Sequence, residues 1–135
     1  MTSKRQSQLY YIRPVIGEPI DNDFLLNGHD ATKIYVLIPV LELYEDGKKF
    51  IGCKVNTYDG VLNFYEAQID SDINDRLRVV IVELAKKAIF AELAIICDVN
   101  PIQFVCSCEC QKKAIIKAFS GYEGFDAKKS FINLE

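Results

Sequence analysis

The sequence lacks the glycine-rich motifs with which many folds bind nucleotides. It contains no Gly-x-x-x-x-Gly-Lys phosphate loop and no Gly-x-Gly-x-x-Gly fingerprint, and its seven glycines are scattered through turn-like stretches. Histidine is also scarce, with one among 135 residues, which disfavours zinc sites of the usual Cys/His composition. Nucleotide handling by either glycine-rich route is therefore excluded, and no cofactor is expected.

Charge of one sign is not in large excess either. The chain has 16 basic and 19 acidic residues and a formal net charge of −3. A protein that binds nucleic acid nonspecifically needs a strong basic excess to neutralise phosphates. Nucleic acid is therefore not indicated as a partner.

Long hydrophobic runs are missing as well. No apolar run approaches the ~20 residues that a membrane-spanning helix requires, because Lys86 and Lys87 interrupt the most hydrophobic region. The first eight residues are polar and basic, with no apolar stretch behind them, so no secretory signal is predicted. An odd number of cysteines in such a chain indicates reduced thiols. We expect a cytoplasmic, intracellular protein without a membrane partner.

The residues that are present favour an α+β fold. A chain of 135 residues that is 50% hydrophobic fits one domain, which we place at residues 33–135, after an N-terminal tail and extended arm over residues 1–32. Asp46-Gly47 and Asp59-Gly60 are strong hairpin signals. They predict a three-stranded antiparallel meander over residues 33–43, 48–57 and 61–69.

The second half of the chain predicts helix, strand and helix. Apolar residues recur with helical spacing from residue 72 to residue 93, on a stripe wider than one sheet contact needs. Residues 95–97 either continue this helix or begin a short extended piece. A strand is predicted over residues 102–108, a second helix over residues 109–119, and a last short strand around Phe131, Ile132 and Leu134.

This order of elements resembles the first two thirds of the ribonuclease H-like fold, a two-layer arrangement. The segments at residues 50–57 and 62–69, the helix opening Asn74-Asp75-Arg76-Leu77, and the passage from residues 102–108 into Gln111-Lys112-Lys113 have the lengths of the corresponding pieces. The similarity contains no specific motif, so it is an analogy of fold and does not establish activity.

The resemblance implies a pair of magnesium ions about 4 Å apart, held by carboxylates from the first strand, the first helix and the end of the fourth strand. The first strand has Glu42 as its one acid, the helix start offers Arg76 and Arg78, and the fourth strand ends in Cys108 with Glu109 just beyond. Arginine repels a divalent cation. The resemblance therefore implies a degenerate, noncatalytic member without catalytic or metal-binding residues.

Three cysteines alternate at Cys106, Cys108 and Cys110. On a strand their sulfur atoms would share one face about 7 Å apart, which leaves a thiol or metal site open beside the ordinary role of cysteine as a small core residue. We prefer the core role. A third reading is a cysteine enzyme that uses Cys108 or Cys110, because the start of a helix lowers the pKa of a thiol.

His29 lies between Gly28 and Asp30 in a predicted loop. A neighbouring aspartate orients an imidazole for general-base chemistry, but no serine or cysteine is tied to His29 by a recognised motif. We interpret it as a solvated loop histidine.

The surplus apolar surface of the long helix is the best functional signal. Broad apolar patches on soluble proteins often mark association sites, and the residues that carry this one are Val79, Val82, Ile89, Phe90 and Leu93. The alternative is burial of the helix between the sheet and the N-terminal arm. We hypothesise a noncatalytic protein-interaction module that binds a protein partner or forms a homodimer. The alternative is a small acidic inhibitor, such as an immunity or phage anti-defence protein, that blocks a partner enzyme.

Overall fold

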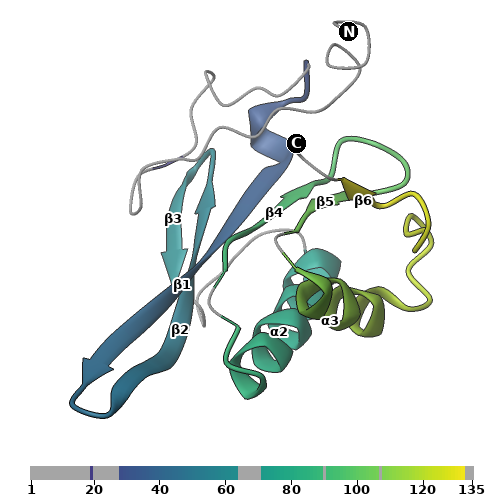
Figure 1. The fold of residues 1–135 in the computed structure, drawn as a ribbon. Helices are drawn as coiled ribbons and strands as arrows, with labels where there is room; N and C mark the ends of the chain where they lie inside the picture. The colour runs from purple at the N-terminus through teal and green to yellow at the C-terminus, as the bar shows by residue number, and fades with distance from the viewer. Residues whose placement is uncertain (1–18, 20–27, 64–70, 90, 107, 133–135) are drawn as a thin grey trace, which may run out of the picture.

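The computed structural model describes residues 19, 28–63, 71–89, 91–106 and 108–132 (Figure 1). Over these residues the fold is α+β, with a six-stranded mixed sheet and two helices. The strands are β1 (Ile34–Tyr44), β2 (Gly47–Thr57), β3 (Gly60–Asn63), β4 (Leu93–Ile96), β5 (Gln103–Val105) and β6 (Phe131–Ile132). The helices are α2 (Ser71–Lys86) and α3 (Glu109–Phe119), and a 3-10 turn, η2 (Ala31–Lys33), precedes β1. Neither helix is long and apolar enough to cross a membrane, as far as the described residues go.

The sheet has the strand order β3-β2-β1-β4-β5-β6. The predicted meander is confirmed over its described part, since β1 pairs antiparallel with β2, and β2 with β3. Gly47 follows the first turn with φ of 136°, a left-handed conformation that favours glycine. The third expected strand is seen as β3, and residues 64–69 lie outside the described residues, as does most of the predicted N-terminal arm.

The prediction of one helix from residue 72 to residue 93 is wrong at its C-terminal end. α2 ends at Lys86, and residues 93–96 form β4, which pairs antiparallel with β1. The expected helix-strand-helix is therefore helix-strand-strand-helix. Leu93–Ile96 is a run of four buried residues, and a continuous apolar run of that length fits a buried strand as well as a buried helix.

The remaining elements follow the sequence closely. α3 spans the predicted residues 109–119, and Gly121 lies just past its end with φ of 83°. β5 covers Gln103–Val105 and is therefore shorter than the strand predicted over residues 102–108. The last short strand is confirmed at Phe131–Ile132, where β6 runs parallel to β5.

Both faces of the central strands are buried, and alternation along each strand assigns residues to a face. On one face, Leu37, Val55 and Ile95 join the main core with residues of α2 and α3. On the other face, Ile34, Val36 and their neighbours form a second buried cluster. The two helices thus cover one face of the sheet, side by side (Figure 1).

Two polar side chains join α2 and α3 to the chain around them. Gln111, which is fully buried in α3, donates from Nε2 to the carbonyl oxygens of Ala91 (2.8 Å) and Glu92 (3.1 Å). Arg76 of α2 donates to the carbonyl oxygen of Ala118 at 2.8 Å. These bonds satisfy main-chain oxygens that would otherwise lose hydrogen bonds on burial.

Candidate interaction surface

The apolar residues that the sequence assigned to one face of the long helix lie in different parts of the structure. Val79 and Val82 are exposed on α2, at 42% and 43%. Leu93 lies in β4 and is buried in the core, and Ile89 is partly buried against the same core. Phe90 lies outside the described residues. The exposed apolar surface of α2 is therefore the pair Val79 and Val82, which is smaller than the sequence suggested.

The three alternating cysteines do not share a strand. Cys106 directly follows β5, Cys108 is the N-cap residue of α3, and Cys110 lies exposed in the first turn of that helix. Burial raises the pKa of Cys106 to about 12, so its thiol stays protonated at neutral pH. The same cause raises the pKa of Cys53 to about 12.

Glu42 and Glu109, the two acids considered as metal ligands, lie on different elements of the fold. Glu42 is exposed on β1, where its Oε2 accepts a hydrogen bond from the Tyr44 hydroxyl at 2.8 Å, and Glu109 lies on α3, 3.9 Å from the Lys112 ammonium group. The Arg76 guanidinium is 4.8 Å from the centre of the Tyr122 ring. Within the described part of the chain, no three His, Cys, Asp or Glu side chains gather closely enough to hold a metal ion.

His29 has an aspartate partner, but that partner is not the neighbour in sequence. His29 Nδ1 lies 2.8 Å from Asp98 Oδ1, and the main-chain N–H of Asp30 donates to Asp98 Oδ2 at 2.9 Å. Asp98 thus ties the loop before β1 to the loop after β4, a link that no local sequence pattern indicates.

The surface that sequence reasoning missed is the outer part of the β1–β2 hairpin. β4 pairs with residues 34–37 of β1, and β3 pairs with residues 54–57 of β2. Beyond these residues the two strands continue as a ribbon that projects from the sheet (Figure 1). We call residues 38–53 the projecting hairpin. A two-stranded ribbon is marginally stable in water by itself, so this part of the molecule gains most from a contact.

An apolar strip runs from the core along one face of the projecting hairpin. Leu37, Pro39, Leu41 and Leu43 lie on the same face of β1, because successive side chains alternate. Their burial falls steadily, from Leu37 in the core through Pro39 and Leu41, which are half-buried, to Leu43, which is 75% exposed. The apolar face that β1 uses in the core therefore extends beyond the helices into solvent.

The strand edges of the projecting hairpin are poorly suited to adding another strand. Pro39 has no N–H to donate from β1. The β1–β2 register shifts between Val40 and Leu41 of β1, which leaves Ile51 of β2 as an extra, 47% exposed residue in a bulge. Proline and bulges are common protections of strand edges. A partner is therefore expected to contact the apolar face rather than the edges.

The comparisons with known proteins give no further guidance. No protein-family model matches the chain, and neither the curated proteins nor the solved structures searched gave a match. The strand lengths predicted from the sequence do not mark the projecting hairpin, because they include a third strand over residues 61–69. In the structure β1 has 11 residues, whereas β4 has four and pairs with residues 34–37 of β1, so among the described residues the outer part of β1 has no strand beside it on the β4 side.

Proposed function

We propose that this chain is a noncatalytic protein-interaction module that self-associates through the apolar face of its projecting hairpin. The observation that carries the proposal is the exposure of Leu43, at the end of a strip that continues the core face of β1. Large apolar side chains that extend a core face into solvent are typical of association sites.

The charge of the hairpin favours a second copy as the occupant. Residues 38–53 contain three acidic and two basic residues, a net charge of −1, and Glu42 lies opposite Lys49 in the register. Two copies of the ribbon therefore meet with little net repulsion. A two-fold arrangement, in which the same patch meets itself, is the commonest form of such contacts.

Sedimentation velocity of the full chain over a range of concentrations tests this proposal. We expect wild type to form dimers, and the double variant Leu43→Ser, Ile51→Thr to remain monomeric with an unchanged far-UV circular dichroism spectrum. The matched control is Val79→Thr, Val82→Thr, which alters the exposed apolar pair on α2. It is expected to dimerise like wild type.

Each other result has a definite meaning. A wild type that stays monomeric at all concentrations contradicts self-association. Loss of the dimer in the α2 variant, with the hairpin variant unaffected, moves the interface to Val79 and Val82.

A high-affinity complex with a basic enzyme, formed by monomeric wild type and weakened by salt, supports the acidic inhibitor instead. Its charge basis is the net charge of −3.

We propose in addition that the fold is a degenerate relative of the ribonuclease H-like fold. The support is the order of elements, with three antiparallel strands joined by tight hairpins before a long helix. The strand β4 has no counterpart in the expected order and counts against it. We expect no cleavage of an RNA:DNA hybrid with magnesium or manganese. Cleavage that disappears in Glu42→Gln or Glu109→Gln would contradict both this proposal and the noncatalytic role.

A further inference from the structure

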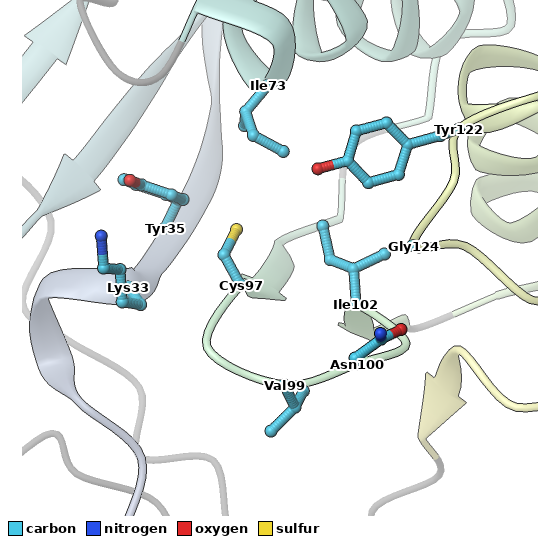
Figure 2. Close-up of a pocket in the computed structure, with 9 residues that line it drawn as sticks. All are labelled: Lys33, Tyr35, Ile73, Cys97, Val99, Asn100, Ile102, Tyr122 and Gly124. Atoms are coloured by element: carbon cyan, nitrogen blue, oxygen red, sulfur yellow. The ribbon is translucent and has the colours of Figure 1, made fainter.

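The C-terminal end of α2 lies beside the base of the projecting hairpin. Ile73, the third residue of α2, lines the same cavity as Lys33 and Tyr35, which lie around the start of β1 (Figure 2). The other end of the helix leads through a short connection to Leu93, which pairs with Leu37, the last residue of β1 before the projecting hairpin. The helix therefore begins near the start of β1 and ends near the hairpin.

This end of α2 presents two exposed lysines. Lys86 is the last residue of the helix, with a side chain that is 68% exposed, and Lys87 follows it, also exposed. The carboxylates described nearby are less exposed, since Glu83 is 11% exposed and bonded to Lys117, and Glu92 is half-buried. Because the apolar strip of the hairpin continues the face of β1 that α2 covers, the lysines and the strip lie on the same side of the sheet.

The turn of the projecting hairpin has the opposite charge. Its two turn residues, Glu45 and Asp46, are both acidic and both exposed. The third acid of the hairpin, Glu42, lies opposite Lys49 in the register, so these two charges offset each other. With Lys48 included, the hairpin keeps a net charge of −1, and its surplus negative charge is carried by the turn.

Charge distinguishes two ways in which a pair of hairpins can meet face to face about a two-fold axis. In a parallel arrangement the acidic turns of both copies come together, and juxtaposed like charges disfavour an interface. In an antiparallel arrangement each turn lies over the base of the other hairpin, beside Lys86 and Lys87. The strip from Leu37 to Leu43 spans about 20 Å, so one overlap of this length brings each turn to the α2 end of the other copy.

We propose that the dimer is antiparallel, with Glu45 and Asp46 of each copy in contact with Lys86 and Lys87 of the other. This inference rests on the proposed function, because it names the contact by which a second copy is recognised. The two-fold axis repeats the contact, so each dimer contains it twice. Exposed ion pairs of this kind determine the orientation of the copies more than their affinity.

Reversal of the charges on each side, followed by sedimentation velocity of the full chain, tests the contact. We call Lys86→Glu, Lys87→Glu the lysine variant and Glu45→Lys, Asp46→Lys the turn variant. Each is expected to weaken dimerisation about tenfold or more, since both contacts in its dimer then join like charges. Far-UV circular dichroism of each variant checks that the fold is retained.

An equimolar mixture of the two variants identifies the contact itself. In a mixed dimer both contacts join opposite charges, although each variant alone joins like charges at both. We therefore expect the mixture to recover dimerisation to within about threefold of wild type, as a reciprocal exchange of interacting charges implies.

The matched control is Lys128→Glu, Lys129→Glu, which changes the net charge by the same amount as the lysine variant. Both residues are exposed and precede β6, at the opposite edge of the sheet from β2 and β3. This control is expected to dimerise like wild type.

The results that overturn this inference differ from those that overturn the proposed function. A wild-type dimer that the lysine variant leaves unchanged overturns the contact alone, and self-association stands. Failure of the mixture to dimerise, or equal weakening by the control, also overturns the contact alone. A wild type that stays monomeric overturns both.

Discussion

The N–H of Ile89 donates to the carbonyl oxygen of Leu84 at 3.0 Å, across the end of α2. Inside this bond the N–H of Ala88 donates to the carbonyl oxygen of Ala85 at 3.2 Å, and Ala88 itself has φ of 54°. The two bonds form a Schellman motif, in which the left-handed position is usually glycine. They end the helix and send the chain back toward β4.

Replacing Ala88 by glycine is expected to stabilise the protein by about 1 kcal/mol, because the left-handed conformation strains every residue with a Cβ. Urea unfolding followed by circular dichroism measures the change. The control is Ala85→Gly, inside α2, which is expected to destabilise by about 1 kcal/mol. Destabilisation by both changes would show that Ala88 does not carry the strain.

Arg76 connects α2 to the end of α3 by a hydrogen bond to Ala118 and by its position over the Tyr122 ring. We expect Arg76→Met to reduce the free energy of unfolding by about 2 kcal/mol, since it removes a charge-assisted bond and a cation–π contact. Arg78→Met, at an exposed position two residues on, is the matched control and is expected to change stability by less than about 0.5 kcal/mol. Equal effects of the two changes would contradict the role of Arg76.

Glu83 gives the folded protein a defined sensitivity to acid. A hydrogen bond from Lys117, whose Nζ lies 3.0 Å from Glu83 Oε2, holds the pKa of Glu83 below its ordinary value, with further help from the charges of Lys117, Lys86 and Lys87. A pKa lowered by folding contributes stability above the unfolded-state pKa, and this contribution is lost as the pH falls through the folded-state pKa.

Glu83→Gln is therefore expected to be less stable than wild type at pH 7, with a difference that narrows and then vanishes as the solution is acidified below the ordinary glutamate range. Thermal unfolding at a series of pH values measures this. Glu109→Gln is the control, because Glu109 is 74% exposed and 3.9 Å from its lysine. A difference between Glu83→Gln and wild type that stays constant with pH would contradict the assignment.

The cysteines are expected to differ in reactivity with iodoacetamide. The thiolate is the nucleophile, and burial raises the pKa of both Cys53 and Cys106 to about 12. Cys110 is exposed, so it should be alkylated first, with Cys53 and Cys106 far behind. Mass spectrometry of timed samples gives the rates, and urea should abolish the differences. Alkylation of Cys53 as fast as Cys110 in the folded protein would contradict the buried position.

Local sequence was sufficient for elements whose signals are local. The two Asp-Gly turns gave the meander, and the apolar spacing with Gly121 gave α3 at its observed ends. The end of α2 was predicted wrongly because Ala88 occupies the left-handed position where a glycine would have indicated the end of the helix. The projecting hairpin was not predicted for a related reason, since the outer part of β1 is left without a neighbour by the end of β4 at Leu93, opposite Leu37.

The sequence by itself determined the α+β class, the hairpins and most helix and strand positions, because turn residues and hydrophobic periodicity act over a few residues. The tertiary structure decided that β4 pairs with β1, that Leu93 is core, that Asp98 binds His29, and that β1 extends beyond β4. These features depend on contacts between segments far apart in the chain, and no local pattern encodes which distant segments will meet.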